Sequence, residues 1–314
     1  MGQLNNYTFS SRSFLDSSGV GGEFDCGFVG YPVDERGAAS VDAVRSRVNN
    51  LYEINFDPKL QATSLDGNVT IRSRLIQKLA GVKNILVDAT TLGVGEILQI
   101  LLVSEQIELK HIEFLYVEPG TYSRIDASAP EDRQLRHFNL TKNHNYVSVQ
   151  GFAKEFDPNL PASHVFMLGF EPGRVQNAFE QRGDLSPALH KVSFIVGVPA
   201  FQTGWEMNTL QPHLSVFEGL SAGEHNISYC AANSIRESYL ALWDLFKQLG
   251  DERRCFFVCP LGTKPSAVGA SLFLFETRSA LNPTSLYFDH PSPIENLSEK
   301  LGMWHQVVVN FVRQ

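Results

Sequence analysis

The stretch that decides the fold is Arg254-Cys-Phe-Phe-Val-Cys-Pro-Leu-Gly-Thr-Lys-Pro-Ser-Ala-Val-Gly-Ala-Ser-Leu-Phe-Leu-Phe-Glu276. It predicts a buried strand at residues 255–259, a Gly-Thr-Lys-Pro turn at 262–265 and then an apolar helix. The start of a helix offers unpaired backbone N–H groups and the positive end of the helix dipole. With the Thr263 hydroxyl and the Lys264 cation beside them, this turn predicts a seat for an anion such as phosphate.

The same alternation of strand and helix extends in both directions from this stretch. Apolar runs that end in polar or glycine-containing turns predict further strands at residues 24–30, 51–56, 84–89, 111–117, 164–170, 192–198, 285–288 and, as a final edge strand, 306–312. Apolar residues at i, i+3 and i+4 predict helices at 40–49, 69–80, 93–105, 174–181, 235–249 and 266–277. This pattern predicts an α/β, Rossmann-like fold: a mostly parallel sheet with helices on both faces, as one sheet or as two fused halves.

Composition along the chain divides it into four segments. Residues 1–22 are rich in Ser, Asn and Gly and predict an N-terminal arm or an edge element. Residues 23–118 form a first α/β half. Residues 119–162 interrupt the pattern with Pro, Asn, Asp and His and hold one weak strand candidate at 146–152, so they predict an excursion. Residues 163–314 are expected to form a second α/β half.

Charge and composition exclude several classes of function. The chain has 314 residues, of which 43% are hydrophobic, and this is enough for a large core. The net charge of −8 argues against duplex nucleic acid as a partner, because phosphate-backbone binding needs a dense basic face and the longest basic run is Arg253-Arg254. Small anions need only one or two local cations.

Apolar stretches and cysteines indicate the compartment. No window has the 18 apolar residues of a membrane span, and the N-terminus lacks the basic and apolar regions of a signal peptide. We therefore expect a cytoplasmic protein with no membrane partner.

Cys255 and Cys259 lie roughly 13 Å apart on an extended strand, too far for a disulfide. With Cys26 and Cys230 they predict buried, reduced thiols, and no His or Cys pair has metal-ligand spacing; we expect no metal and no cofactor.

In open parallel sheets the ligand crevice forms outside the carboxyl ends of the strands, so the turns after the strands are the candidate sites. Six such turns carry polar residues: 31–36, Asn55 with Asp57, 88–91, 118–122, 171–174 and 262–265. Helix caps alone also supply Asp, Thr and Glu at these places. For Asp88, Thr90 and Thr91, capping and ligand contact therefore both remain open.

Two arginines stand at predicted helix starts, where a cation is electrostatically unfavourable unless an anion lies nearby. Arg36 follows Glu35, and Arg174 follows Glu171 by three residues. One interpretation is an ion pair with that glutamate which braces a loop. The other is a phosphate or carboxylate clamp, for which the guanidinium fork is suited.

Catalytic motifs are absent from the sequence. It contains no Gly-x-Ser-x-Gly, no phosphate-binding Gly-x-x-x-x-Gly-Lys-Ser/Thr loop and no His-Glu-x-x-His. His290, beside Asp289 and just past a predicted strand, is the histidine best placed for acid–base work, but a loop histidine is more often solvated. The sequence therefore names no catalytic residue.

The strand-Gly-Thr-Lys-Pro-helix segment resembles the glycine-threonine-lysine signature of CRISPR-associated Rossmann-fold (CARF-like) sensor domains. In those sensors further glycine or Ser/Thr residues precede the signature, whereas Cys259-Pro260-Leu261 stand here. The chain is also similar to uncharacterised bacterial defence-associated proteins, through the Glu35-Arg36 turn, the aspartate-led turn at Asp88 and the Gly-Thr-Lys-Pro turn. The resemblance implies binding of a cyclic oligoadenylate-like ligand across a dimer and control of an effector in antiviral defence.

The function expected first is a sensor or regulatory subunit that binds a nucleotide or another phosphorylated small molecule. Its expected partners are a homodimer mate or an effector protein. The expected ligand-binding residues are Gly262, Thr263, Lys264, Asp88, Thr90, Thr91, Arg36, Glu171 and Arg174. One alternative is a nucleotide or nucleoside hydrolase or transferase with Asp88, Glu118 or Glu171 as acid or base. A structural scaffold subunit is the other.

The C-terminal segment 294–312 bears on assembly, because it ends in an apolar, β-branched run. Left unpaired, such a strand would be an adhesive edge. Either the protein's own sheet covers it, or it pairs with a second copy or a partner. The second possibility predicts a homodimer or a stable hetero-complex.

Overall fold

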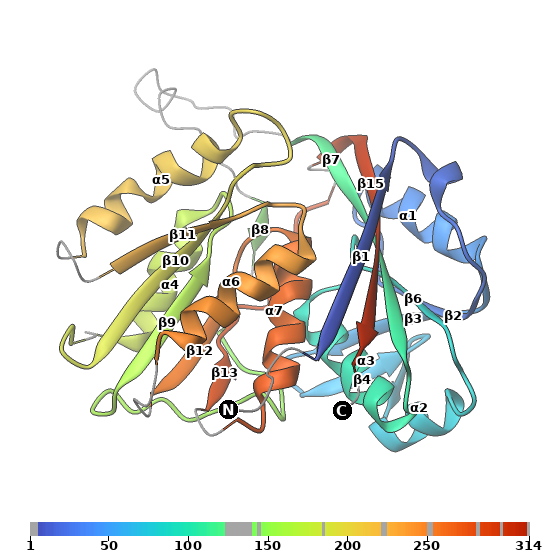
Figure 1. The fold of residues 1–314 in the computed structure, drawn as a ribbon, viewed down its shortest axis with the longest axis horizontal. Helices are drawn as coiled ribbons and strands as arrows, with labels where there is room; N and C mark the ends of the chain where they lie inside the picture. The colour runs from blue at the N-terminus through green and yellow to red at the C-terminus, as the bar shows by residue number, and fades with distance from the viewer. Residues whose placement is uncertain are drawn as a thin grey trace. The chain divides into compact units, whose positions relative to one another are not determined.

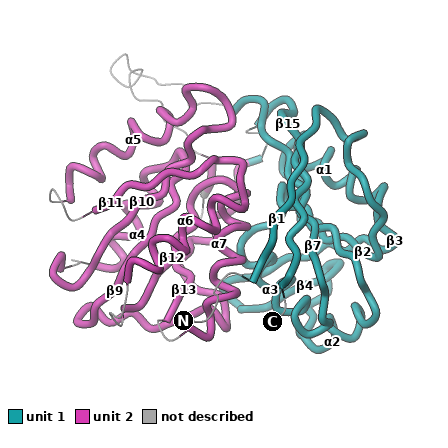
Figure 2. Tube along the Cα trace, in the orientation of Figure 1, with its two compact units in different colours: residues 1–122, 295–314 teal, residues 123–294 magenta. Residues whose placement is uncertain are grey.

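The computed structural model describes residues 6–122, 140–142, 146–183, 186–220, 225–249, 254–280, 283–295 and 298–312. The chain forms two compact units (Figure 2). Unit 1 comprises Met1–Tyr122 with Glu295–Gln314, and unit 2 comprises Ser123–Ile294. Each unit has its own sheet with helices packed on it, so the fold class is α/β, as the alternation of strands and helices predicts.

Unit 2 is built on a five-stranded sheet in which all neighbouring strands run parallel (Figure 1). In spatial order the strands are β11 (His225–Cys230), β10 (His190–Gly197), β9 (Ala162–Met167), β12 (Cys255–Pro260) and β13 (Thr284–Leu286). β9, which comes first among these five strands in the sequence, is therefore central, with two later strands on each side of it. Every residue of β9 is buried, as a strand covered on both faces requires.

Four helices connect these strands. They are α4 (Pro172–Arg182), α5 (Glu206–Glu218), α6 (Ile235–Lys247) and α7 (Lys264–Thr277). Right-handed crossovers place α4 and α5 on one face of the sheet and α6 and α7 on the other (Figure 1). α7 is buried along almost its whole length, because it is apolar on all sides. Helices on both faces agree with the Rossmann-like fold predicted from the sequence.

The weak strand predicted at residues 146–152 is not formed. Val147 makes a single antiparallel bridge to Phe288. Further along, the carbonyl oxygen of Phe152 accepts a hydrogen bond of 2.9 Å from the N–H of Leu286. The segment thus follows β13 through isolated contacts instead of a ladder. Nearby, β8 (Thr141–Lys142) pairs with β14 (Ser292–Pro293).

Unit 1 contains an eight-stranded mixed sheet. Its spatial order is β1 (Tyr7–Phe14), β15 (Ser298–Phe311), β7 (His111–Tyr122), β6 (Ile85–Asp88), β2 (Phe24–Val29), β3 (Val48–Asp57), β4 (Ala62–Leu65) and β5 (Asn68–Thr70). The four central strands, from β7 to β3, pair in parallel. The outer strands pair antiparallel. Parallel pairing, which the sequence predicts for most of the sheet, is confined in this unit to its centre.

The helices of unit 1 are α1 (Glu35–Arg45), α2 (Arg72–Lys78) and α3 (Val94–Gln106), with a 3-10 turn η1 (Ser17–Gly19) near the N-terminus. α1 begins five residues before the start predicted at Ser40. The reason is a cap: the carboxylate of Asp34 accepts a 2.8 Å hydrogen bond from the N–H of Gly37. A core cluster around Trp304, Val117 and Leu86 packs against this helix.

The two ends of the chain correct the predicted division into halves. The N-terminal arm predicted at 1–22 contains β1, which pairs with β15 along its whole length. The C-terminal residues, expected in a second half at 163–314, join unit 1 because β15 lies between β1 and β7. β15 is thus an interior strand, so the edge strand predicted at 306–312 is wrong in its position. The argument for a homodimer from an unpaired C-terminal edge loses its premise.

The cysteines agree with the prediction of reduced thiols. All four are free; Cys26, Cys230 and Cys259 are buried and Cys255 is half-buried. Burial raises the pKa of the Cys26 thiol to about 12 and that of Cys255 to about 11. Within the described ranges, none of the helices combines the length and the apolar character that crossing a bilayer requires.

Candidate functional site

The carboxyl ends of the parallel strands in unit 2 form one edge of the sheet, and the candidate site lies there. The chain passes from β9 to β10 on one side, while β12 lies on the other side of β9. The order of strands therefore reverses between β9 and β12, and open α/β sheets bind ligands outside the carboxyl ends at such a reversal. The Gly-Thr-Lys-Pro turn lies at this point, between the end of β12 at Pro260 and the start of α7 at Lys264.

Thr263 caps α7. Its Oγ1 atom accepts a 3.3 Å hydrogen bond from the N–H of Ser266 and donates one of 2.6 Å to the carbonyl oxygen of Ala232. The Ser266 hydroxyl in turn donates to the carbonyl oxygen of Thr263 at 2.6 Å. Because Ala232 follows β11, the cap ties α7 to the carboxyl end of a second strand. Both hydroxyls donate within the protein, so donors for a bound anion must come from backbone N–H groups and Lys264.

Two glycines allow the turns after β9 and β12 to pass each other. A Cβ atom at Gly262 would lie 2.9 Å from Ser266 Oγ and 3.0 Å from the carbonyl oxygen of Leu168. At Gly169 a Cβ would lie 2.5 Å from the carbonyl oxygen of Leu261. These approaches require glycine at both positions. Backbone atoms therefore form much of the surface at the reversal.

A small hollow opens beside these turns. Its volume is about 10 Å³, room for one water-sized group. The carboxyl ends of three strands and the first turn of α7 line it, through Met167, Leu168, Ile195, Gly197, Cys230, Ala232, Thr263 and Ser266. Its walls are mostly apolar, and the two hydroxyls supply a polar edge of the kind that orients a ligand group.

Lys264 is the first residue of α7 and is half-buried. Its charge adds to the positive potential that the backbone of this 14-residue helix produces at its N-terminus. Gly262, Thr263 and Lys264 thus lie together at the carboxyl edge of the sheet, where the sequence places this turn.

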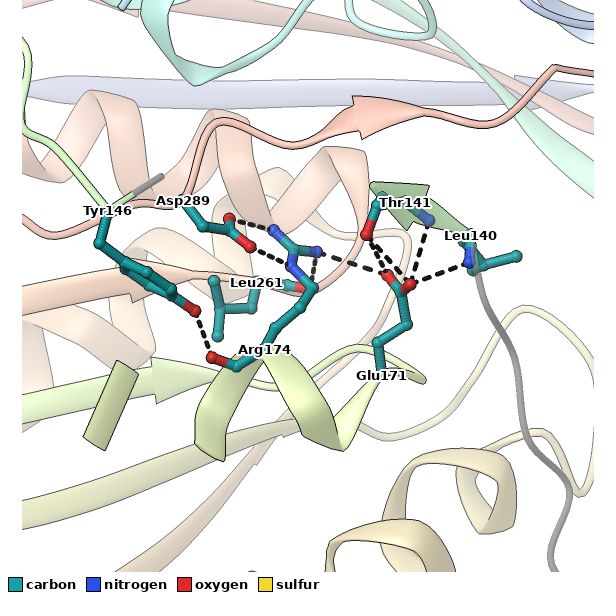
Figure 3. A network of polar contacts seen from close by, with 7 residues as sticks. All are labelled: Leu140, Thr141, Tyr146, Glu171, Arg174, Leu261 and Asp289. Atoms are coloured by element: carbon teal, nitrogen blue, oxygen red, sulfur yellow. Dashed lines mark hydrogen bonds and ion pairs between the residues drawn. The ribbon is translucent and has the colours of Figure 1, made fainter. Parts of the chain in front are cut away.

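Arg174, predicted as a clamp or a brace, lies in a network of buried polar contacts in the first turns of α4 (Figure 3). Its guanidinium donates two hydrogen bonds of 2.6 Å to the carboxylate of Asp289. A third goes to the carbonyl oxygen of Leu261 at 3.2 Å, and Tyr146 donates to the carbonyl oxygen of Arg174 itself. The ion pair with Glu171 predicted from the sequence exists, at 3.8 Å, but Asp289 is the closer partner.

The Glu171 carboxylate accepts the hydrogen bonds of a second part of this network. Its Oε1 atom accepts hydrogen bonds from the N–H groups of Leu140 and Thr141 at 2.8 and 3.0 Å. The Thr141 hydroxyl donates to the same carboxylate (Figure 3). Glu171 therefore fixes residues 140–141 against the start of α4. Through Leu261, which precedes Gly262, Arg174 fixes α4 against the candidate site.

In unit 1, Asp88 ends β6 and is fully buried. Its carboxylate accepts hydrogen bonds from the Ser40 hydroxyl at 2.6 Å, the Thr91 hydroxyl at 2.7 Å and the N–H of Thr90 at 2.9 Å. Burial nevertheless raises the pKa of Asp88, with these hydrogen bonds acting against the rise. The Thr90 hydroxyl accepts a bond of 3.1 Å from the N–H of Val117. These contacts match the first of the two interpretations of this turn, in which its polar side chains cap and bond within the protein.

The strand order of unit 1 also reverses, between β2 and β6. At that reversal the backbone of unit 1 itself fills the carboxyl edge of the sheet. The N–H of Gly30, just after β2, donates to Thr91 Oγ1 at 2.8 Å. A Cβ at Gly30 would lie 2.8 Å from the carbonyl oxygen of Thr91. The turns after the two strands are therefore in direct contact, and the carboxylate of Asp88 is directed into the protein.

Arg36 is buried at the start of α1. Its carboxylate partner is Asp34 at 3.5 Å, not the Glu35 expected from the sequence, because Asp34 is the capping residue and lies on the same side of the helix start. One guanidinium nitrogen donates to the carbonyl oxygen of Val117 at 3.3 Å, and the guanidinium lies 6.0 Å from the centre of the Tyr116 ring. The Nε atom of Arg36 has no hydrogen-bond partner among the described residues.

The predicted site residues therefore fall into two groups. The group in unit 2 comprises Gly262, Thr263, Lys264, Glu171 and Arg174, and the group in unit 1 comprises Arg36, Asp88, Thr90 and Thr91. Sequence reasoning missed the partners that define both groups, above all Asp289, Asp34 and Ser266. His290, beside Asp289, is half-buried, and burial lowers its pKa to about 4. This histidine is neutral at physiological pH.

Comparison with known proteins adds no family. A scan against protein-family models gives no match, and a search of curated proteins also gives none. Fold and site define the class: an α/β protein whose second unit carries a five-stranded, all-parallel Rossmann-like sheet with a helix N-terminus at its carboxyl edge.

Proposed function

We propose that unit 2 binds a nucleotide or another phosphorylated small molecule at the carboxyl ends of β9, β10 and β11 beside the start of α7, and that the protein is a sensor or regulatory subunit. The observation that carries this proposal is the hollow beside the N-terminus of α7, at the reversal of strand order. Backbone N–H groups in the first turn of a helix bind phosphate oxygens without any special side chain.

The proposed roles follow from the contacts. The backbone N–H groups of the Gly262-Thr263-Lys264 turn and the Lys264 ammonium hold phosphate, because Pro265 has no N–H and the N–H of Ser266 bonds to Thr263 Oγ1. The hollow admits one oxygen-sized group, and the rest of the ligand lies across the strand ends. Arg174 and Glu171, whose polar atoms already bond within the unit, position the turn and do not touch the ligand. At the equivalent edge of unit 1 the turns at Gly30 and Thr91 are in contact, which supports our assignment of the ligand to unit 2.

A sensor needs an output, and we assign it to a second copy of the chain or to a partner effector protein. The resemblance of the Gly-Thr-Lys-Pro segment to CRISPR-associated sensor domains supports antiviral defence in the cytoplasm as the setting. Catalysis on nucleotides is the second candidate, through Asp88 or Glu171. Binding is favoured over it because the carboxylates of both residues accept several hydrogen bonds inside the protein. A scaffold would bind no small molecule at all.

Lys264→Ala tests the proposal. We expect the variant to bind nucleotides or phosphorylated small molecules about 10- to 150-fold more weakly, which corresponds to the 1.5–3 kcal/mol of a charged hydrogen bond. Its melting temperature should stay close to that of the natural chain, because alanine is a good helix former at this position. The ligand panel comprises nucleoside mono-, di- and triphosphates, cyclic oligoadenylates and inorganic phosphate, and isothermal titration calorimetry measures the binding.

Lys247→Ala is the matched control, since Lys247 ends α6 at the opposite edge of the same sheet. It should leave the affinity unchanged. Mass spectrometry of small molecules released from the purified protein identifies a ligand carried through purification. A stability loss in Lys264→Ala with unchanged affinity assigns Lys264 a structural role and contradicts the proposal. Turnover of a nucleotide that Asp88→Asn or Glu171→Gln abolishes would establish the enzyme instead.

A further inference from the structure

A chain of hydrogen bonds joins a serine, a histidine and a glutamate on three neighbouring strands of unit 1. Ser13 lies on β1, His305 on β15 and Glu118 on β7. The Ser13 Oγ atom lies 2.8 Å from His305 Nδ1, and His305 Nε2 lies 2.8 Å from Glu118 Oε1. Ser13 and His305 are cross-strand partners, so their side chains share one face of the sheet.

The donors in this chain of contacts follow from the chemistry of the three groups. When the imidazole is neutral, a carboxylate oxygen of Glu118 accepts from it, so Nε2 carries the hydrogen. The Nδ1 atom of His305 is then an acceptor, and the Ser13 hydroxyl donates to it. A hydroxyl directed at a basic nitrogen that a carboxylate orients is the arrangement of an activated nucleophile.

The three residues differ in burial in the way that a nucleophile and its base require. The Glu118 and His305 residues are 5% and 8% exposed, and the Tyr116 ring stacks on the imidazole at 6.3 Å between ring centres. Ser13 is exposed and belongs to β1, the outermost strand of the sheet. The base is therefore held away from water while the hydroxyl is accessible to a substrate.

An irregularity in β15 places Glu118 within reach of the histidine. The register between β15 and β7 shifts between Leu301 and Trp304. A Cβ at Gly302 would lie 2.9 Å from Glu118 Cβ and 3.0 Å from its carbonyl oxygen, so glycine is needed for this approach. Bulges of this kind redirect side chains beside active sites.

We propose that Ser13 is the nucleophile of a second, hydrolytic site that takes carboxylic esters, independent of the anion site in unit 2. Ser13 Oγ attacks the ester carbonyl carbon while its proton passes to His305 Nδ1. The bond to the leaving alkoxide oxygen breaks, and the alcohol departs with that proton, which leaves the acyl group on Ser13. Water then attacks the acyl carbon, gives a proton to Nδ1 and releases the acid, and Ser13 recovers its proton.

The two residues behind the nucleophile have different roles. His305 is the general base and then the general acid, since it exchanges the proton with the reacting atoms. Glu118 is a positioning residue that holds the imidazole and stabilises it when protonated. An edge strand carries alternate N–H groups that the sheet does not use, and to those of β1 we assign the oxyanion.

Covalent labelling tests the nucleophile. A fluorophosphonate probe should modify the full chain at Ser13, as located by peptide mass spectrometry. Ser13→Ala should abolish the labelling, and His305→Gln should slow it by about 100-fold or more. Ser11→Ala is the matched control: Ser11 is exposed on the same face of β1 but lies opposite Val307. Glu118→Gln, whose amide oxygen can still accept from His305 Nε2 but carries no charge, should slow the labelling at an unchanged melting temperature, and Glu118→Ala should slow it further.

A cysteine version separates activation from folding. In Ser13→Cys the thiol lies beside His305, and in Ser11→Cys it does not. We expect the first to react with iodoacetamide at pH 7 about 10-fold faster or more, because a neighbouring imidazole promotes the thiolate. The native thiols give little background, since burial raises the pKa values of all four. Equal alkylation rates at positions 13 and 11, or no fluorophosphonate label on Ser13, would overturn the proposal.

Discussion

Arg174 and Asp289 carry opposite charges at a place from which water is excluded. Asp289 has no exposed surface, and both N–H···O distances between the two side chains are 2.6 Å. Arg45 and Asp42 form an equally direct pair, at 2.9 Å, on the exposed face of α1. Removing one partner of a buried pair leaves a charge without compensation, whereas an exposed pair contributes little to stability.

At the residue scale we therefore expect Asp289→Asn to lower the free energy of unfolding by about 3–5 kcal/mol. Asp42→Asn, where the pair is 61% and 74% exposed, is the control and should cost less than about 1 kcal/mol. Urea denaturation measures both. Similar losses for the two variants would contradict the assignment of Arg174 and Asp289 as a structural pair.

At the scale of elements, two helical glycines have opposite surroundings. Gly269 lies where α7 meets α6: a Cβ there would be 2.7 Å from the carbonyl oxygen of Ile235 and 2.9 Å from the backbone nitrogen of Tyr239. Gly173 lies in the first turn of α4, and a Cβ there would meet nothing within 4 Å. Intrinsic helix propensity favours alanine at both positions, so packing alone separates them.

Gly173→Ala should raise the free energy of unfolding by about 0.5–1 kcal/mol, because alanine reduces the entropy of the unfolded chain. Gly269→Ala should lower it by about 1–3 kcal/mol, because the methyl group meets the α6 backbone. Thermal denaturation of the two variants gives the signs directly. A gain in stability for both would show that α6 and α7 tolerate a wider separation than the structure has.

At the scale of the whole molecule, histidines buried in unit 2 contribute to the pH dependence of stability. His164 Nε2 lies 3.3 Å from His190 Nδ1, and His190 Nε2 bonds to the carbonyl oxygen of Pro158 at 3.0 Å. Burial first, and then the charges of Arg182 and His190, lower the pKa of His164 to about 3. The rings of Phe156 and Phe257 also pack on His164.

An unfolded histidine gains its proton near pH 6.5, while folded His164 and His290 stay neutral until pH about 3 and about 4. Below pH 6.5 the unfolded chain therefore binds more protons than the folded one. We expect the free energy of unfolding to fall as the pH decreases from 6.5 toward 4, by up to about 1.4 kcal/mol per pH unit for each histidine. Urea denaturation at pH 7, 6 and 5 measures this slope.

His164→Gln is the control for this slope, because the Gln amide can still donate to His190 Nδ1 and does not titrate. The variant should lose stability less steeply between pH 6 and pH 5 than the natural chain. Identical slopes would mean that His164 gains its proton in the folded state as readily as in the unfolded one.

Local order is what the sequence by itself determines about this protein. Strands such as β12 and helices such as α7 follow from the apolar runs and their period, and the Gly-Thr-Lys-Pro turn falls between them as predicted. The predicted elements omit α5 and the strands β1, β4, β5, β8, β11 and β14. β4 and β5 are short, β1 is mostly exposed, and α5 carries Pro212 in its interior, so their periodic signals are weak.

Only the tertiary structure decides which strands and side chains that are distant in the sequence become partners. β15 pairs with β1, nearly the whole chain away, which moves the C-terminus into unit 1. Asp289 pairs with Arg174 across 115 residues, and Ser13 with His305 across 292. Hydrophobic period and capping preference are properties of neighbours in the chain, so they predict which element a residue joins. Which distant side chain it meets depends on how strands and helices pack, and that choice is made only when the apolar faces of the whole unit are buried together.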